Sequence, residues 1–439
     1  MGRFIVFTHS KVDVEDYRKE FNGHEFVFLS YRLIHSDAIV IGSNNLEQIF
    51  KDIEREHSVL PFHGVLYGYL PEIYVLVAEQ LNKRLGLPRG IGEATYARDK
   101  YLMGKALSAR LECPDSRLIQ NASDLHAVKD TDFPCVLKPR FGYGSICVIK
   151  VHDRRELGKE YREKKATIEQ MARVNPLGMG STDFLVESFI GGTEHTIDSF
   201  VEDSEVVFQA ISDKLPMTPP YFVEVGDVMP SRLAAHDKEN IRQGVQEAIR
   251  ALGIEHGWTH AEVKLFNGTL YFMEVAARNG GGYFRDLVKI VYGVDMRKVL
   301  IDSFLGKPFR MHTPPMNTVI GNKIVCYGVT LIWKVTGLEE FRGKDYCKEL
   351  IQKLPDKGAG VYLGPPYSYN NTLMSYLIIQ PSSRNAFAMM REAHEAIKIH
   401  GISILQRSRC FHALFMMVLR FLDHFPRINA AVSKLLRLG

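Results

Sequence analysis

The sequence FMEVAARNGGG at residues 272–282 joins an apolar strand to a run of glycines. Glu274 stands near the end of that strand, Arg278 follows four residues later, and three glycines begin at Gly280. A charged side chain in a buried strand costs free energy unless it has a partner or a ligand. The stretch therefore raises the possibility of a binding site where the strand ends.

A second apolar strand, HAEVKLF, comes just before this one, and Asn267-Gly268 between them is a strong signal for a β-hairpin. A two-residue turn at Asn267-Gly268 would place Glu262 opposite Met273. Because side chains alternate along a strand, Glu274 would then project from the other face of the sheet.

A three-residue loop over 266–268, with Gly268 in the left-handed conformation, gives a different register. It pairs Glu262 with Phe272 and His260 with Glu274, so the two glutamates become diagonal neighbours on one face. Diagonal neighbours lie about 7 to 8 Å apart, close enough to share a cation, and oxygen-only ligands suit magnesium. The alternative is that both carboxylates are simply solvated on an open sheet face.

The segment PCVLKPRFGYGS at 134–145 predicts a strand that ends at Lys138 and is stopped by a proline, followed by a glycine loop. Backbone amides of a loop containing Gly142, Gly144 and Ser145 can approach and cradle phosphate oxygens, and Lys138 supplies a positive charge. An ordinary hairpin turn with a surface lysine is the alternative reading.

Composition limits the class of protein. The chain has 439 residues, 46% of them hydrophobic, and a formal net charge of +4, so we expect two to four compact units and no nucleic-acid partner. Its six cysteines show no metal-binding spacing, and the N-terminus lacks a signal-peptide pattern, which favours reduced thiols and a cytoplasmic location. No apolar run is long enough to span a membrane as a helix.

Apolar periodicity predicts a small parallel α/β layer in the first hundred residues. A helix over 71–86 would begin near Pro71 and be capped by Gly86, and one continuous helix is expected over 92–111. Strand patterns dominate from 183 onward, and residues 308–317 look like a linker. The helix FRDLVKIVYG would bury one face, formed by Phe284, Leu287, Val288, Val291 and Tyr292.

Taken in order, these pieces resemble the ATP-grasp superfamily, and within it the carboxylate-amine ligases that join amino acids. The resemblance extends over most of residues 1–400. The spacing of twelve between the two acids also occurs in this superfamily and favours the three-residue loop. The matching motifs are Asp99-Lys100, Lys138-Pro139 with GYGS, LVESFIGGTEHTID at 185–198, and Glu262 with Glu274 and Arg278.

The resemblance implies an α/β (α+β) ATP-grasp fold preceded by a Rossmann-like domain. The expected parts are an N-terminal pre-grasp α/β domain (1–92), grasp subdomain A (93–181) with its glycine loop (141–145), grasp subdomain B (182–310) with the metal site, a C-terminal α/β subdomain (311–400) and a basic amphipathic helical tail (401–439).

The resemblance also implies an ATP site with magnesium, or alternatively manganese, as the metal. Glu262 and Glu274 would bind the metal. The nucleotide would be held at its phosphates by Lys100, Lys138 and the loop of Gly142, Gly144 and Ser145, at adenine by the hinge Glu187, Ser188, Phe189 and Ile190, and at the ribose by Glu194.

On the substrate side, Arg278 would act in catalysis by steadying a carboxylate or its acyl phosphate, while Gly280 and Gly281 make room for the reacting group. Lys214 is a second catalytic candidate, and Glu224 a candidate holder of the amine's ammonium group, although a plain surface loop explains that segment equally well. Many superfamily members have asparagine at the position of Ala276, so binding of a second metal ion is in doubt.

The resemblance therefore predicts an enzyme that activates a small carboxylate with ATP as an acyl phosphate and joins it to an amine, releasing ADP and phosphate. The alternatives are a carboxylating enzyme of the biotin carboxylase type and a catalytically idle nucleotide-binding regulator. Relatives often dimerise, so a homodimer is one expectation. The basic amphipathic tail is expected to pack on the protein or a partner subunit, with peripheral membrane contact as the alternative.

Overall fold

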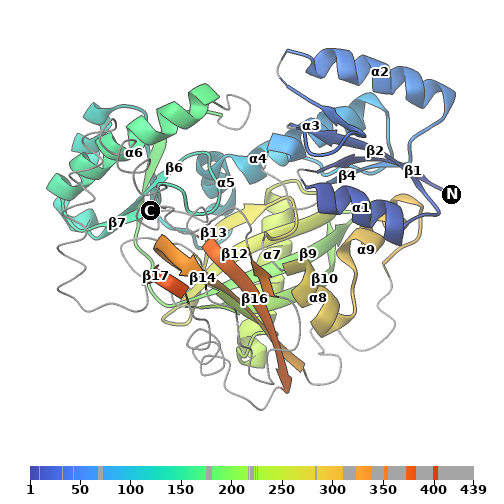
Figure 1. The fold of residues 1–439 in the computed structure, drawn as a ribbon. Helices are drawn as coiled ribbons and strands as arrows, with labels where there is room; N and C mark the ends of the chain where they lie inside the picture. The colour runs from blue at the N-terminus through green and yellow to red at the C-terminus, as the bar shows by residue number, and fades with distance from the viewer. Residues whose placement is uncertain are drawn as a thin grey trace. The chain divides into compact units, whose positions relative to one another are not determined.

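The computed structural model describes most of residues 1–309 and four strands beyond them (Figure 1). Within 1–309 the description leaves out 9, 32, 43, 68–72, 175–179, 216, 218–221, 223, 225 and 282–283. The chain divides into two compact units. The first comprises Met1–Tyr143, Val151–Asp213 and Met229–Ile320, and the second comprises Gly144–Lys150, Lys214–Val228 and Gly321–Gly439.

The N-terminal part of the first unit is a parallel sheet with the strand order β3-β2-β1-β4, which confirms the expected α/β layer. Figure 1 shows α1 and α2 on opposite sides of this sheet. The elements are β1 (Arg3–Phe7), α1 (Lys11–Glu20), β2 (Glu25–Ser30), β3 (Ala38–Val40), α2 (Leu46–Val59), β4 (Gly64–Tyr67) and α3 (Ile73–Arg84).

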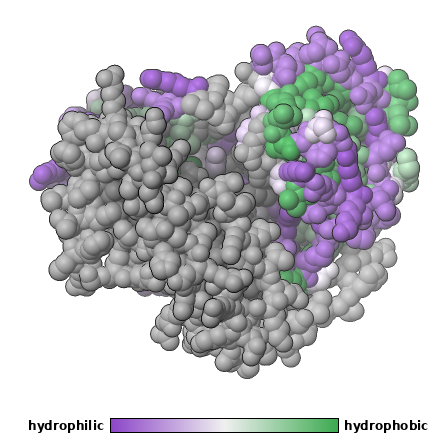
Figure 2. All heavy atoms as spheres, viewed as in Figure 1, coloured by the Kyte–Doolittle hydropathy of each residue, from purple (hydrophilic) through white to green (hydrophobic). Residues whose placement is uncertain are grey.

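Both faces of this sheet are buried, as parallel sheets require. On one face Tyr17 of α1 packs against Phe26 and Phe28 of β2. On the other face Phe7 of β1 joins Phe50 of α2 in the core. Figure 2 shows hydrophobic and hydrophilic residues side by side on the described surface, and the exposed apolar side chains include Leu33, Ile39, Val40, Val59 and Leu60.

Gly86 caps α3 as expected. Its φ is +58°, Gly86 N–H donates to Lys83 O at 3.1 Å, and Leu87 N–H donates to Asn82 O at 3.1 Å. These are the two hydrogen bonds of a Schellman motif, which needs a left-handed residue at this position. Pro71, the expected start of the helix, lies outside the described residues.

The single helix expected over 92–111 is wrong. The segment forms two helices, α4 (Ala94–Arg98) and α5 (Lys100–Leu107), separated at Asp99. The Asp99 carboxylate accepts hydrogen bonds from Tyr101 N–H at 3.0 Å and Leu102 N–H at 3.3 Å, so it caps α5. Lys100 is therefore the first residue of a helix, which fixes where its side chain begins.

A smaller antiparallel sheet carries Lys138 and the expected hinge in the strand order β5-β8-β6. β6 continues through Pro139, which pairs with Phe184, so the expectation that the proline stops the strand is wrong. Pro139 is tolerated because Arg140 N–H makes the next hydrogen bond on this side, to Asp183 O at 2.9 Å, so the pairing needs no N–H at residue 139. The elements are β5 (Ser116–Ile119), η1 (Ala122–Ala127), η2 (Asp130–Asp132), β6 (Cys135–Pro139), β7 (Ile149–Val151), α6 (Arg154–Val174) and β8 (Phe184–Ser188).

A larger antiparallel sheet in the first unit has the strand order β13-β12-β9-β10. One face packs on α5 and α7 through a core that includes Ile197, Val263, Met103 and Val245. In chain order, the elements from residue 193 to 276 are β9 (Thr193–Glu202), β10 (Glu205–Lys214), β11 (Gly226–Met229), α7 (Ala235–Ala251), β12 (Gly257–Phe266) and β13 (Thr269–Ala276).

The opposite face of this sheet is apolar at one end and polar at the other. Phe200 and Trp258 pack together there, and Trp258 Nε1 donates to Met296 O at 2.8 Å, so α8 (Phe284–Tyr292) and α9 (Met296–Phe304) cover the apolar end. The five buried residues of α8 are those expected from its periodicity. The other end of the face carries His260, Glu262 and Lys264, which follow Trp258 at alternate positions of β12.

In the second unit, β14 (Lys323–Leu338) pairs antiparallel with β16 (Thr372–Pro381) and β17 (Ile399–Ser403). β16 also pairs antiparallel with β15 (Ile351–Lys353). Residues 310–322 and 404–439, which hold most of the expected linker and tail, lie outside the described residues. No described helix combines the length and apolarity that crossing a membrane requires.

Candidate active site

Glu262 and Glu274 are direct register partners across β12 and β13. The turn is the two-residue Asn267-Gly268 type, since Phe266 pairs with Thr269 and the φ angles are +51° and +80°. The expected three-residue loop and diagonal pairing are therefore wrong. The prediction that a two-residue turn would place Glu262 opposite Met273 is also wrong, because Glu262 pairs with Glu274.

A β-bulge between the pairs Val263–Phe272 and Glu262–Glu274 explains how a two-residue turn can still place the two glutamates opposite each other. β13 holds one extra residue there, Met273, and the alternation of its side chains shifts phase. Phe272 and Val275 can then both enter the core, at 2% and 0% exposure, while Glu274 joins Glu262 on the polar face. Directly opposite side chains have Cβ atoms about 4.5 to 5.5 Å apart, closer than the expected diagonal pair.

Lys100 lies beside this carboxylate pair. Its Nζ is 3.0 Å from Glu274 Oε1 and donates to Gly142 O at 2.8 Å. The lysine is 9% exposed, so its charge is poorly hydrated and depends on these contacts. The contacts join the start of α5, the metal-site strand and the start of the glycine loop.

The second expected phosphate lysine contacts the expected hinge. Lys138 Nζ lies 2.7 Å from Glu187 Oε2, and both side chains are about nine-tenths buried. β6 and β8 are adjacent strands, so this ion pair crosses from the strand before the glycine loop to the hinge strand. Ser188 is the last residue of β8, and its Oγ accepts from Asp115 N–H at 3.0 Å.

Lys264 also faces this site and was missed by the sequence reasoning. Its Nζ donates to Ile190 O at 3.0 Å, lies 3.6 Å from Glu194 Oε2, and sits 5.4 Å from the centre of the Phe189 ring. The alternation of HAEVKLF contained the signal, because Lys264 shares a strand face with Glu262. Two of the expected hinge residues, Phe189 and Ile190, and the expected ribose residue Glu194 thus lie around one buried ammonium.

The segment after β13 is held by a buried aspartate. Gly280 N–H donates to Asp198 Oδ1 at 2.9 Å, and His260 Nδ1 lies 3.2 Å from the same oxygen. A Cβ on Gly280 would come within 2.6 Å of His260 Nδ1, so the glycine makes room for His260. Arg278 Nη1 donates to Asn279 O at 3.0 Å, and Gly281 O accepts from Phe284 N–H at 3.4 Å.

The remaining expected residues belong to the second unit. Gly144 and Ser145 both have φ near +58°, and Ser145 Oγ donates to Phe222 O at 2.5 Å. Lys214 Nζ lies 3.7 Å from Glu224 Oε2. Glu224 Oε1 is buried and has no hydrogen-bond partner among the described residues, so this carboxylate retains an unused acceptor.

Asp213, next to Lys214 in the chain, is held from three sides. It accepts from Ser231 Oγ at 2.5 Å and Arg232 N–H at 2.9 Å, and its Oδ1 lies 2.9 Å from His195 Nδ1. Burial acts to raise the pKa of Asp213, but hydrogen bonds, chiefly from His195 and Ser231, hold that pKa below its usual value. These contacts fix the end of β10 from which Lys214 projects.

The donor set at Glu262 and Glu274 fits magnesium. Magnesium is usually bound by one or two carboxylates, and completes its shell with water and phosphate oxygens. In the part of the chain that the structure describes, no group of three or more His, Cys, Asp or Glu side chains is gathered for a metal. Ala276 pairs with His260, and its methyl group supplies no ligand for a second metal ion.

Two cysteines near the smaller sheet are poor nucleophiles. Burial raises the pKa of Cys113 to about 11 and that of Cys135 to about 12. Neither forms a disulfide. Thiolate is the reactive form of cysteine, so these two side chains are unsuited to covalent catalysis.

A model of the ATP-grasp domain matches residues 131–285. Carnosine synthase 1 of Gallus gallus is 28% identical over 177 residues, which are 40% of this chain and 19% of that protein. Alanine–anticapsin ligase of Bacillus subtilis (strain 168) is 28% identical over 247 residues, which are 53% of this chain and 52% of that protein.

Among solved structures, the L-amino acid ligase from Bacillus licheniformis superposes with a TM-score of 0.74 at 20% identity, covering 91% of this chain and 98% of that one. At this identity the likeness concerns the fold. The chain spans about half or less of the length of the two curated relatives. Together the matches confirm the α/β ATP-grasp fold expected from the sequence.

Proposed function

From the premise that the chain carries an ATP-grasp domain, we propose that it is an ATP-dependent carboxylate-amine ligase. It activates a small carboxylate, in our proposal that of an amino acid or a related acid, as an acyl phosphate. An amine then displaces phosphate. The products are a C–N bond, ADP and phosphate.

The observation that carries the proposal is the direct pairing of Glu262 with Glu274 beside Lys100. Two carboxylates on one face suit a divalent cation, and an ammonium group next to them suits the phosphates that such a cation binds. If the two glutamates were simply solvated on an open sheet face, they would not need a buried lysine whose Nζ lies 3.0 Å from Glu274 Oε1. The curated relatives, two ligases by name, support the same reaction class.

In this proposal the chain's own groups neutralise the phosphates. When bound by Glu262 and Glu274, magnesium would offset charge on the transferring phosphoryl group. Lys100 and Lys138 would bind phosphate oxygens, and the glycine loop would place backbone N–H groups over them. Glu187 to Ile190 would hold adenine, and Glu194 the ribose.

The reaction needs two bond exchanges. A carboxylate oxygen attacks the terminal phosphorus, forming an O–P bond as the bond to the ADP oxygen breaks. The ammonium form of the amine first loses one proton to solvent. Its nitrogen then attacks the acyl carbon, forming a C–N bond as phosphate leaves, and gives up a second proton. Arg278 would stabilise the negative charge of the carboxylate and the acyl phosphate, and Gly280 and Gly281 would border that group.

For the amine, the candidate is Glu224. Its buried Oε1, which lacks a hydrogen-bond partner among the described residues, would accept a hydrogen bond from an ammonium group on the substrate. Lys214, 3.7 Å from the other oxygen, would hold the carboxylate in place or contact a substrate carboxylate. We also retain as proposals the five-part domain division, a homodimer, a cytoplasmic location and packing of the tail against protein.

The test is ADP and phosphate release by the purified full chain with ATP and magnesium, across amino acids supplied singly and in pairs, with mass detection of the product. A Glu274→Gln variant is the blank, and Glu239→Gln, on the exposed side of α7, is the matched control. We expect pair-dependent ADP formation with a condensed product that is absent only in Glu274→Gln.

Other outcomes would contradict the proposal in different ways. ADP release that depends on bicarbonate, with a carboxylated product, would favour the biotin-carboxylase type of reaction. Tight ATP binding without turnover for any pair of substrates would favour an idle nucleotide-binding regulator.

A further inference from the structure

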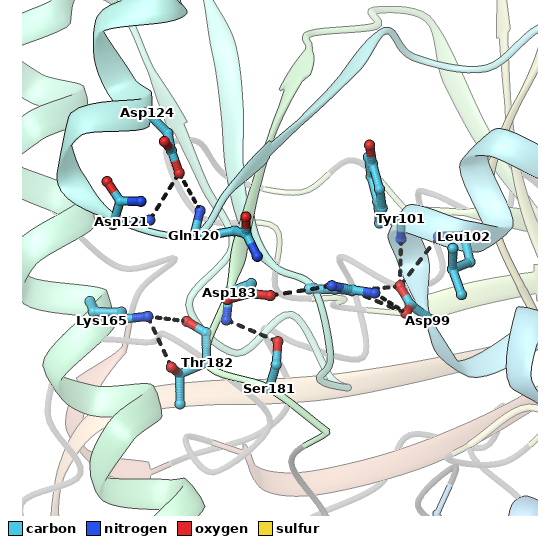
Figure 3. Close-up of polar contacts among 11 residues, drawn as sticks. Asp99, Tyr101, Leu102, Gln120, Asn121, Asp124, Lys165, Ser181, Thr182 and Asp183 are labelled. Carbon is cyan, nitrogen blue, oxygen red and sulfur yellow. Dashed lines mark hydrogen bonds and ion pairs between the residues drawn. The ribbon is translucent and has the colours of Figure 1, made fainter.

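Arg140 bridges two carboxylates that lie far apart in the sequence. Its Nε is 2.9 and 3.0 Å from the two Asp99 oxygens, and its Nη2 donates to Asp99 Oδ2 at 2.6 Å. On the other side, Nη1 donates to Asp183 Oδ2 at 3.2 Å. Figure 3 draws these contacts of Asp99 and Asp183 with the residues around them.

The main chain of Arg140 contacts the same two segments. Arg140 N–H donates to Asp183 O at 2.9 Å, and Lys100 N–H donates to Arg140 O at 3.3 Å. Each neighbour is thus held by one backbone and at least one side-chain contact. Asp99 is 3% exposed, so this charge pair is shielded from water far more than a surface ion pair.

Both partners are themselves anchored. Asp99 caps α5 through the N–H groups of Tyr101 and Leu102, as Figure 3 shows. The segment before Asp183 is fixed by α6, because Lys165 Nζ donates to Thr182 O at 2.7 Å and to Thr182 Oγ1 at 2.9 Å. Arg140 therefore connects two rigid supports.

The three connected segments carry the charged groups of the proposed nucleotide site. Lys100 directly follows Asp99, Lys138 lies two residues before Arg140, and Glu187 projects from β8, which begins at Phe184 after Asp183. The glycine loop (141–145) starts directly after Arg140, and Gly142 O accepts from Lys100 Nζ. One guanidinium is in a position to set the spacing of both lysines.

Arginine suits this role and lysine does not. The planar guanidinium presents several N–H groups in a fixed fork, so it can bind one carboxylate through two nitrogens and a second carboxylate through the third. A lysine ammonium keeps the positive charge but has no fork that fixes two carboxylates at a set distance.

We propose that Arg140 is a positioning residue that holds Lys100 and Lys138 at the separation that the phosphates of ATP require. The role rests on the proposed function, since it concerns the same nucleotide site. It assigns to Arg140 no contact with the nucleotide and no part in the chemistry. Its effect is on nucleotide affinity through the two lysines.

The test measures the dissociation constant of Mg–ADP by titration calorimetry, with the thermal midpoint of each full-length variant recorded. Arg140→Gln is expected to weaken binding about tenfold or more, in line with the loss of a bidentate charged contact. Arg140→Lys, which keeps the charge, is expected to weaken it nearly as much. The matched control is Arg84→Gln, which removes a bidentate pair with Glu47 in the N-terminal sheet region and should leave affinity unchanged.

Asp99→Asn separates positioning from stability, because asparagine still caps α5 but loses the charge that binds Arg140. If Arg140 positions the two lysines, Asp99→Asn should weaken Mg–ADP binding. Adding Arg140→Gln to Asp99→Asn should then cause little further loss of affinity. Full additivity, or unchanged affinity in a folded Arg140→Gln protein, overturns the proposal. Full rescue by Arg140→Lys also overturns it, since charge alone would then suffice.

Failure of the proposed function gives a different result. Wild-type protein that binds neither Mg–ADP nor Mg–ATP would overturn both proposals. Wild-type binding with no response to Arg140→Gln overturns only the positioning role. If Arg140→Gln does not fold, the test rests on the Mg–ADP affinities of Arg140→Lys and Asp99→Asn. Wild-type affinity in both variants would contradict the positioning role of Arg140.

Discussion

Lys100 Nζ lies 3.0 Å from Glu274 Oε1, so the first residue of α5 is ion-paired with the metal-site strand β13. The pair is only partly exposed, with 9% of the lysine and 26% of the glutamate side chain accessible. Lys100 thus links the proposed metal ligand with the start of the glycine loop, where it donates to Gly142 O.

Replacing Lys100 by methionine removes this charge while keeping most of the side chain's volume. We expect Mg–ADP binding to weaken about tenfold or more, because hydrogen bonds to charged groups contribute about 1.5 to 3 kcal/mol. Titration calorimetry measures the change. Lys105→Met, at an exposed position on the same helix, is the control, and equal affinities for the two variants would contradict the role of Lys100.

Glu262→Gln removes one of the two paired carboxylates without changing the shape of the side chain. We expect ADP formation to fall about 100-fold or more at low magnesium, because the cation loses an anionic ligand. The measurement is the initial rate across a magnesium titration. A rate that matches wild type at every magnesium concentration would show that the cation does not depend on Glu262.

Gly268→Ala tests the turn between β12 and β13. Gly268 has φ +80° and nothing within 4 Å of an added Cβ, so the substitution costs only conformational free energy. We expect the free energy of unfolding to fall by about 1 kcal/mol. Gly104→Ala is the control, since Gly104 lies inside α5 in equally open space, and urea denaturation should show it neutral or up to about 1 kcal/mol more stable.

Gly280→Ala tests how the segment after β13 is held. The new Cβ would lie 2.6 Å from His260 Nδ1 and 2.8 Å from Phe284 Cδ2, so the segment that carries Arg278 must shift. We expect kcat to fall at least tenfold, since small misplacements of reacting groups are costly, with Mg–ADP affinity kept within about twofold. Loss of nucleotide affinity with unchanged kcat would place the effect of Gly280 elsewhere.

His256 makes stability depend on pH. Burial, together with the positive charge of Arg89, lowers its pKa from 6.5 to about 4, so the folded protein holds this histidine neutral. A depressed pKa means that the unfolded chain binds the proton first, at about pH 6.5. Stability is therefore present above pH 6.5 and is lost as pH falls towards 4, by about 3 kcal/mol for this group.

The measurement is urea denaturation of wild type and His256→Gln between pH 7.5 and 4.5. Glutamine keeps a donor for the contact that His256 Nε2 makes with Ser303 Oγ at 3.0 Å, and it does not titrate. Wild type should lose more stability than the variant over this range. Parallel pH curves would show that His256 does not carry the effect.

The sequence determined the local elements of the fold and most of the residues of the candidate site. Short apolar runs identified β1, β2 and β12, the 3.6-residue period identified the buried face of α8, and Gly86 marked the end of α3. These signals are local, because propensity, periodicity and caps depend on neighbours within a few positions. The motifs were also readable in order along the chain.

Tertiary structure decided the register of the metal-site hairpin and the break between α4 and α5. The bulge at Met273 exists because Phe272 and Val275 both enter the core, although they lie three positions apart in the sequence. The helix breaks at Asp99, where its carboxylate caps α5 and also binds Arg140, the residue that follows β6. Both depend on contacts between residues distant in sequence, and the free energy of packing and charge pairing there outweighs local preference.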